Sequence, residues 1–274
     1  MLAIKVACPI VSAGSGSDVY FKLLKKALEK EGIELDLICL PYRYEFLPGM
    51  AYRLRKQLKK YDLIHTNADY GGLFKLSGTP LIVTLHHDVF DSANYSRASF
   101  LQKIYYNLLL KYRVQHSFSV ADAVICPSHY TAKCVKKSYA DEPNNIHVIS
   151  NGVDTSWFTP TPSIKRDRRM LLFVGSLSKR KGVDLLPKII DVLSDQGYRL
   201  TCVGGDSHPL LSSNPNITCA GRVSDEKLLE LYRRAGCFVF PSRLEGFGYS
   251  VVEAAMCGCP VVTTDTSSLP EVLN

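Results

Sequence analysis

Two glutamates in the C-terminal third of the chain, Glu245 and Glu253, have seven residues between them in the stretch EGFGYSVVEAAMCGCPVV. Residues 248–258 predict a helix, and the side chains around Glu253 in that helix are apolar. A carboxylate that is buried without partners strongly destabilises a fold. The sequence therefore predicts that Glu253 faces a ligand that offers hydrogen-bond donors.

Glycine-containing turns follow two strand-like runs. The first run ends before Gly14 and Gly16, and a helix pattern follows directly, so that backbone amides there favour an anion. The second run ends at Gly175, and between it and Gly182 stand three consecutive cations, Lys179, Arg180 and Lys181. Arg can bind a diphosphate through two hydrogen bonds, and Lys can bind it as a point charge. The alternatives are a tight turn in the first case and a solvated turn in the second.

Other chemistry-bearing residues favour or disfavour further classes of protein. His86 and His87 end the strand-like run LIVTLHH. They are candidates for ligand contacts, with a structural role as the alternative. Nine cysteines, mostly inside apolar runs, are typical of a reducing compartment, and their spacing predicts no metal site. The chain lacks a three-glycine dinucleotide fingerprint, an Asp-x-Asp pair, a Gly-x-Ser-x-Gly elbow and a Walker loop. Redox-cofactor, hydrolase and kinase functions are therefore disfavoured.

Strand-like and amphipathic runs alternate along the whole chain, whose composition, 46% hydrophobic and 22% charged, is that of a globular protein. The predicted helices lie near 18–31, 53–60, 98–117, 181–196, 225–235 and 248–258. A stretch rich in Pro, Thr, Ser and Gly at 151–168 predicts a linker. Such alternation indicates an α/β fold of two Rossmann-like, doubly wound parallel-sheet domains, 1–160 and 161–274, that face a cleft.

Longer motifs resemble a known family. The runs FVGSLSKRKG and PSRLEGFGYSVVEAAMCGCPVVTTDTSSLPEV resemble the donor-binding half of the retaining glycosyltransferases of family four, also called group 1, which have the GT-B fold. NGVDTSWFTP resembles their interdomain segment, and a looser similarity in the first half rests on Gly16, His86 and ADAVICPS. The resemblance is strongest from residue 147 onward. It implies transfer of a sugar, with retention, from a nucleoside diphosphate sugar to a hydroxyl of a glycan, lipid or small molecule.

The resemblance also implies roles for matching positions. Glu253 would accept hydrogen bonds from both ribose hydroxyls of the donor, and Glu245 would hold the transferred sugar. Arg180 and Lys181 would neutralise the diphosphate leaving group, so no metal and no cofactor are implied. His86 would face the sugar from the first domain.

Backbone groups complete the implied donor site. The remaining donor-binding residues are Gly16, Arg222, Val223, Gly246, Phe247 and Gly248. One departure affects the phosphate contacts, because the family often has Arg immediately after the glycine of FVG, where this chain has Ser176. Either Arg180 takes over that charge or phosphate binding is weaker, and Lys181 is the firmer of the two assignments.

The end of the chain is a second departure from the family. The sequence stops at SSLPEVLN, about 110 residues into a domain for which roughly 150 to 200 are ordinary, and family members continue with another strand and further helices. This predicts a C-terminally truncated chain with an incomplete second domain. The alternative to the enzyme is accordingly a weakly active or inactive fragment that binds nucleotide sugars.

The net charge of +7 is concentrated in the N-terminal half. Five basic residues lie between Arg53 and Lys60, and Lys22, Lys25, Lys26 and Lys30 lie on the first predicted helix. This pattern favours a solvated helix surface, with peripheral contact with an anionic membrane and a nucleic-acid module as alternatives. We expect no nucleic-acid partner. Because the sequence shows neither a signal peptide nor a membrane span, it predicts a cytoplasmic protein, with a peripheral location at the inner membrane face as the alternative.

Overall fold

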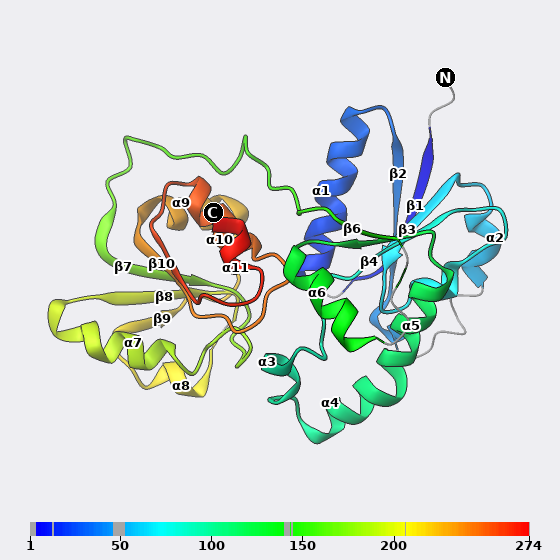
Figure 1. Ribbon diagram of the computed structural model, residues 1–274. Coiled ribbons are helices and arrows are strands. Elements are labelled where there is room, and N and C mark those ends of the chain that lie inside the picture. Colours follow the sequence, from blue (N-terminus) through cyan, green and yellow to red (C-terminus); the bar gives the residue numbers. More distant parts are fainter. Residues whose placement is uncertain are drawn as a thin grey trace. The chain divides into compact units, whose positions relative to one another are not determined.

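The computed structural model describes residues 4–12, 14–45, 53–139, 143, 145–205 and 207–273 (Figure 1). The chain divides into two compact units, Met1–Gly152 and Val153–Asn274. This division falls inside the predicted linker at 151–168, somewhat before the predicted boundary after residue 160. Each unit is an α/β structure in which strands and helices alternate along the chain.

The first unit is built on a parallel sheet with the strand order β2-β1-β3-β4-β5-β6. Every strand pair in it is parallel, as the alternation of strands and helices predicts. The sequence prediction did not include the short strand β6. The strands are β1 (Lys5–Val11), β2 (Glu34–Leu40), β3 (Leu63–Asn67), β4 (Leu81–Thr84), β5 (Ala123–Cys126) and β6 (Ile146–Val148).

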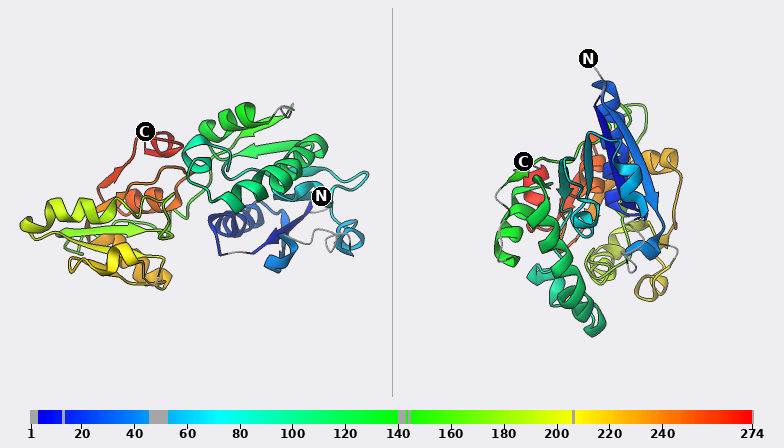
Figure 2. Two further views of the ribbon diagram at one scale, coloured as in Figure 1. Left: turned by 90° about the horizontal axis from the view of Figure 1, so that it is seen from below. Right: turned by 90° about the vertical axis from the view of Figure 1, so that its right-hand side faces the viewer.

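Helices connect these strands and cover the sheet (Figures 1 and 2). They are α1 (Gly16–Lys30), η1 (Tyr42–Glu45), α2 (Arg55–Leu58), η3 (Gly71–Phe74), α3 (Ser92–Tyr95), α4 (Phe100–Tyr105), η4 (Tyr106–Leu110), α5 (Lys111–Val120) and α6 (His129–Ser138). The predicted helix at 98–117 is a continuous helical run from Phe100 to Val120, in which η4 is a π-helical segment. The predicted basic helix at 53–60 is wrong in length, because only the single turn α2 is α-helical.

The second unit contains a parallel sheet with the strand order β11-β10-β7-β8-β9. The strands are β7 (Asp167–Val174), β8 (Arg199–Val203), β9 (Ile217–Cys219), β10 (Ala235–Phe240) and β11 (Val261–Thr263). The helices are α7 (Leu186–Leu193), η5 (Ser194–Gln196), α8 (Pro209–Ser212), α9 (Asp225–Arg234), α10 (Tyr249–Met256) and α11 (Leu269–Leu273). The predicted helix at 181–196 begins later than expected, at Leu186, because residues 179–185 form turns.

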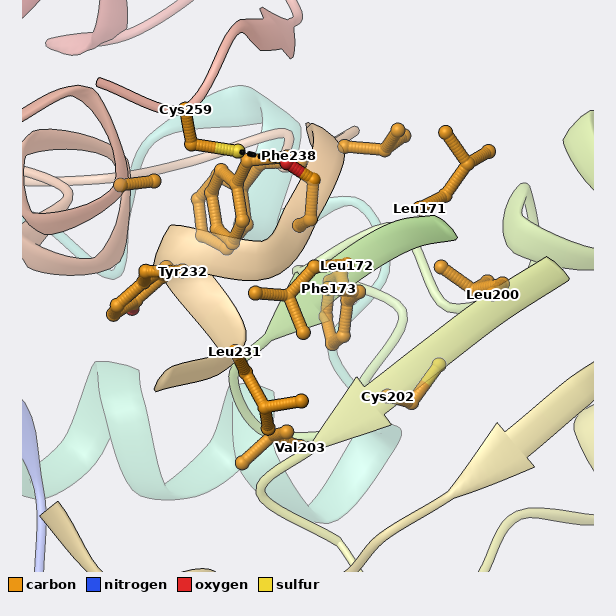
Figure 3. Close-up of a cluster of buried hydrophobic side chains, with 14 of the residues drawn as sticks. Leu171, Leu172, Phe173, Leu200, Cys202, Val203, Leu231, Tyr232, Phe238 and Cys259 are labelled. Atoms are coloured by element: carbon orange, nitrogen blue, oxygen red, sulfur yellow. Dashed lines mark hydrogen bonds between the residues drawn. The ribbon is translucent and has the colours of Figure 1, made fainter. Parts of the chain in front are cut away.

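Aromatic and aliphatic side chains from β7, β8 and β10 form the core of the second unit (Figure 3). Leu172, Phe173 and Phe238 are fully buried, and Tyr232 of α9 packs edge-on against Phe238. Cys259 donates a weak hydrogen bond from its thiol to the carbonyl of Ala235. All nine cysteines are free thiols, and several of them are buried as small apolar side chains.

Candidate active site

The loops after β7 and β10 lie at the topological switch point of the second unit. In the order β11-β10-β7-β8-β9, the chain fills one side of β7 first and then crosses to β10 on the other side. Ligands of open parallel sheets bind at such a point, outside the carboxyl ends of the strands. The residues concerned are 175–185 after β7 and 241–248 after β10.

Glu245 is the buried carboxylate of this site. Its side chain is 8% exposed, and its Oε1 lies 2.6 Å from the ammonium of Lys181. Ser242 donates to the same oxygen at 2.5 Å. The guanidinium of Arg180 lies 3.6 Å from Oε1 and donates a hydrogen bond to the carbonyl of Leu244 at 2.8 Å. The structure thus brings together Glu245, Lys181 and Arg180, and their roles toward a donor stay predictions.

The charged groups of this cluster shift one another's pKa values. Burial alone would raise the pKa of Glu245, but Lys181, Arg180 and the Ser242 hydroxyl together hold it below its ordinary value. Burial lowers the pKa of Lys181 from its ordinary value, and Glu245 opposes that change. The Lys181 ammonium also lies 4.8 Å from the centre of the Phe240 ring, which favours the cation. The result is a carboxylate and an ammonium that are both charged in a largely desolvated place.

The loop that carries the cations is fixed to the loop after β10. Arg243 forms two hydrogen bonds of 2.8 Å to the carboxylate of Asp184 and a third, of 2.6 Å, to the carbonyl of Lys179. Gly182 has φ +77°, and a Cβ at this position would lie 2.1 Å from the carbonyl oxygen of Pro241. Only glycine fits this approach. The positive φ of Gly182 is not helical, so the helix predicted from residue 181 cannot include this turn.

Two serines fix the backbone of Glu245 from the other side. The amide of Glu245 donates to the hydroxyl of Ser267 at 3.0 Å, and Ser268 donates to the Glu245 carbonyl at 3.0 Å. Gly248, which precedes α10, has φ +95°. Gly246, Phe247 and Gly248 are buried, in the loop that leads into that helix.

The environment of Glu253 differs from the prediction. Tyr232 donates its hydroxyl proton to Glu253 Oε2 at 2.8 Å, so the carboxylate has a partner within the protein. The helix α10 is also not apolar and buried all round, because Ala255 is exposed and Val252 and Glu253 are half-buried. Burial raises the pKa of Glu253, and the hydrogen bond from Tyr232 only partly offsets this. The argument that an uncompensated charge requires a ligand is therefore wrong, while the ribose contact stays a prediction.

The connection between β9 and α9 holds the last two predicted residues of this unit. Arg222 is exposed and Val223 is half-buried. They lie at the carboxyl end of the same parallel sheet as the loops after β7 and β10. Their role in donor binding stays a prediction.

In the first unit, His86 lies just beyond the end of β4 and takes part in a network of hydrogen bonds. Its Nε2 lies 2.9 Å from Asn67 Oδ1, and the Asn67 amide donates to the Tyr70 hydroxyl at 2.7 Å. With the Asn67 amide nitrogen assigned toward Tyr70 and its oxygen toward His86, Nε2 is the donor of this hydrogen bond. Nδ1 of the neutral ring is then a hydrogen-bond acceptor.

A second histidine, His65 on β3, lies beside the same aromatic rings. Its Nε2 lies 2.7 Å from the Thr84 hydroxyl, and both histidine rings pack edge-on against Tyr20 and Phe21 of α1. Burial lowers the pKa of His86 to about 3 and that of His65 to about 4. Both rings are therefore uncharged at neutral pH.

The glycine turn before α1 already holds an anion of the protein itself. The carboxylate of Asp18 accepts hydrogen bonds from the amides of Gly14, at 2.6 Å, and Ser15, at 3.3 Å. This is a capping arrangement in which a side chain satisfies the first amides of the helix. The structure favours the tight-turn interpretation of the turn, and donor binding at Gly16 stays a prediction.

Several residues of these networks were missed in the sequence. Ser242, Ser267, Tyr232, Asn67 and His65 each contact a predicted site residue or the network around it. Asn67 carried a usable signal, since a polar residue that ends a buried strand lies at the ligand-binding edge of a parallel sheet. Tyr232 carried none, because it occupies an ordinary core position of an amphipathic helix.

Two further findings concern the part of the chain that the structure describes. Within it, no three His, Cys, Asp or Glu side chains are arranged so that they could hold a metal ion. None of its helices has the length and hydropathy that a bilayer crossing requires.

Comparison with known proteins agrees with this architecture. A family model described as glycosyl transferases group 1 matches residues 168–274, and one described as glycosyltransferase family 4 matches residues 39–157. An MMP alpha-(1->4)-mannosyltransferase of Mycolicibacterium hassiacum is 25% identical over 277 residues, which cover 92% of this chain and 67% of that protein. The chain spans about two thirds or less of the length of the curated relatives that it matches.

Solved structures share the fold of both units. A sucrose-phosphate synthase from Thermosynechococcus elongatus aligns with a TM-score of 0.76 at 21% identity and covers 97% of this chain and 82% of that one. The HepE protein of Anabaena, solved with UDP, aligns with a TM-score of 0.70 at 18% identity, over 99% and 83% of the two chains. The two family models together cover most of the sequence, and the two parallel-sheet units match GT-B structures. The chain therefore belongs to the group 1 glycosyltransferases and has their GT-B fold.

Proposed function

We propose that the protein transfers a sugar from a nucleoside diphosphate sugar to an acceptor hydroxyl, with retention at the anomeric carbon. The observation that carries the proposal is the cluster of Lys181, Arg180 and Glu245 at the switch point of the second unit. A cation pair fixed beside a buried carboxylate suits a ligand that combines a diphosphate with sugar hydroxyls. The UDP in the HepE structure supports a nucleotide as the donor's leaving part.

The two cations would stabilise the leaving group. In the transfer, the bond between the anomeric carbon and the phosphate oxygen breaks, and its electron pair leaves with the nucleoside diphosphate. A bond forms between the acceptor oxygen and the anomeric carbon, and the acceptor proton leaves with the phosphate oxygen. Lys181 has three N–H donors and uses one on Glu245, so two remain for phosphate oxygens. Preorganised charges of this kind lower the barrier without reorganisation, and we propose that the transfer needs no metal.

The remaining groups would orient the donor. Glu245 would accept hydrogen bonds from the transferred sugar, and Glu253 from the ribose, in exchange for or in addition to Tyr232. The neutral His86 ring would act as a hydrogen-bonding group and not as an acid, because its pKa of about 3 leaves it unprotonated at neutral pH. The nine free thiols support a reducing compartment such as the cytosol.

Calorimetry with nucleoside diphosphates tests the assignment of the two carboxylates. We expect Glu253→Gln to weaken binding of the preferred nucleoside diphosphate by about one to two powers of ten, since hydrogen bonds to a charged group contribute about 1.5–3 kcal/mol each. Glu245→Gln should lower sugar transfer more than nucleotide affinity. Glu226→Gln, which makes the same charge change on the exposed first turn of α9, is the matched control.

Two outcomes would contradict these assignments. If Glu253→Gln binds the nucleoside diphosphate as tightly as the Glu226→Gln control, the ribose assignment is wrong. If the protein binds UDP, GDP or ADP but transfers no sugar from the corresponding donors, the alternative of a binding protein without turnover holds.

A further inference from the structure

The helical run from α4 through η4 to α5 has two apolar faces. One face packs into the core of the first unit through the buried side chains of Leu110, Val114 and Phe118. The other face points away from that core. Its large side chains, hereafter the outward face, are Phe100, Leu101, Ile104, Leu108 and Tyr112.

The exposure of the outward face is high for side chains of this kind. Leu101 and Leu108 are each 76% exposed, Phe100 is 77% exposed, and Tyr112 is 70% exposed. From Leu101 the positions recur at intervals of three or four residues, which aligns them along one side of the helix. A helix that is apolar on both sides is ordinarily buried on both sides. Because the core of the unit covers only one side, the outward face is a candidate surface for a partner.

The charges around this face are all of one sign. The segment 92–121 contains no Asp or Glu and carries Arg97, Lys103, Lys111 and Arg113. The ammonium of Lys103 lies 5.4 Å from the centre of the Tyr95 ring, and that of Lys111 lies 5.6 Å from the centre of the Phe90 ring. The two lysines therefore stand within the same helical run, next in sequence to Ile104 and Tyr112 of the outward face.

We infer that the outward face of α4–α5 docks this protein on a lipid bilayer that contains anionic lipids. A helix that lies in a membrane interface inserts Phe, Leu and Ile between the headgroups, while lysines on its borders meet anionic headgroups. The outward face has both parts of this pattern. A protein–protein interface is a weaker match, since lysine is depleted there.

The membrane contact predicted at Arg53–Lys60 lacks one of the two parts. That segment has the positive charge, but Leu58 is fully buried and Leu54 packs against the core. Arg55 donates a hydrogen bond to the carbonyl of Lys75, and Lys60 lies over the ring of Tyr61. The segment therefore has charge without exposed apolar side chains. The inference moves the predicted contact to another surface and does not depend on the proposed sugar transfer.

Vesicle sedimentation of the full chain tests the inference. The probes are vesicles of phosphatidylcholine alone and of phosphatidylcholine with phosphatidylglycerol in equal parts. We expect binding to the anionic vesicles to exceed binding to the neutral ones by at least about tenfold and to weaken at high salt. Combined Leu101→Gln, Leu108→Gln and Tyr112→Gln should lower binding to anionic vesicles by at least about tenfold.

Two further variants separate the contributions. Combined Lys103→Gln and Lys111→Gln should lower binding to anionic vesicles and leave binding to neutral ones unchanged. The matched control combines Val192→Gln, Leu210→Gln and Val262→Gln, which removes exposed apolar side chains of the second unit and should leave vesicle binding unchanged. Circular dichroism establishes that each variant is folded.

The inference is overturned if the wild-type chain does not bind anionic vesicles, or if the triple variant of the outward face binds them as tightly as the control. It is also overturned if the chain forms a dimer in solution that this triple variant abolishes while wild-type vesicle binding is absent. In that case a second copy, and not a lipid surface, covers the outward face.

Discussion

The pair of Lys181 and Glu245 should be strongly coupled, and replacement of Lys181 by Met tests this. Met has nearly the length of the lysine stem but lacks the ammonium, which lies 4.8 Å from the centre of the Phe240 ring. The substitution removes the ammonium that lies 2.6 Å from Glu245 Oε1. It leaves a carboxylate that is 8% exposed with two weaker means of compensation, the Ser242 hydroxyl and the Arg180 guanidinium 3.6 Å away.

The size of the effect follows from this environment. Removal of one partner of a buried ion pair costs about 3–5 kcal/mol, and the remaining help from Arg180 places Lys181→Met near 3 kcal/mol, roughly the lower end of that range. Glu245→Gln should cost less, about 1.5–3 kcal/mol, because the carboxamide oxygen still accepts from Lys181 and Ser242. The double variant has no uncompensated charge. Its cost should therefore fall below the sum of the two single costs by more than about 1.5 kcal/mol.

Urea unfolding followed by fluorescence is a suitable assay. The only tryptophan of the chain, Trp157, belongs to the second unit and is 39% exposed, so its emission reports on that unit. The cost of Lys181→Met should also depend on pH. The pKa of Glu245 is lowered in the folded wild type, so the pair stabilises above the ordinary carboxyl pKa, and this contribution is lost as pH falls through the folded value. The difference between wild type and variant should consequently shrink in acid.

The reasoning is refuted if the free energies of the two single variants add within about 0.5 kcal/mol in the double variant. It is equally refuted if Lys181→Met is as stable as wild type at neutral pH. In either case Glu245 would be compensated without Lys181, and the site would not depend on this ion pair.

Two further predictions concern stability. The pKa values of about 4 for His65 and about 3 for His86 lie below the ordinary 6.5, so the unfolded chain binds protons first and stability should be lost as pH falls below 6.5. Between pH 6.5 and pH 5, each ring should lower the free energy of unfolding by about 2 kcal/mol, measured by urea unfolding. A free energy of unfolding that does not depend on pH in this window would contradict the burial argument. Gly182→Ala should lower the free energy of unfolding by more than about 2 kcal/mol, because its Cβ would meet the Pro241 carbonyl. Gly197→Ala is the control and should lower it clearly less, because Gly197 has nearly the same φ but only the flexible end of an arginine side chain nearby. Equal losses of stability would show that the close approach is unimportant.

Local pattern was sufficient for the layout of the chain. Each strand predicted in the sequence is a short apolar run flanked by polar or glycine residues, and the helix at 225–235 is correct within a residue because Ser224 caps it. Glu245 with Lys181 was also predictable. These residues stand in long motifs, and the βα loops of neighbouring parallel strands must end at the same edge of the sheet.

The partner of Glu253 and the start of the helix predicted at 181–196 depend on contacts between elements that are distant in the sequence. Glu253 has a partner in Tyr232, 21 positions earlier, and no pattern within α10 indicates that α9 points a hydroxyl at it. Gly182 adopts a non-helical φ of +77° where it approaches Pro241, on a loop that follows another strand, so the helix predicted from residue 181 does not begin there. Neither effect can be read from a window of neighbouring residues.

The two apolar faces of α4–α5 illustrate the same limit. Composition and periodicity predicted a helix there, and that prediction is confirmed, although its end lies three residues later. The sequence alone determined that the helix carries apolar side chains and only positive charges. Which side of it meets the core was decided by the tertiary structure, because a helix with apolar side chains on two sides has no single apolar stripe that fixes its rotation. Packing of Val114 in the core of the unit leaves Leu108 in solvent.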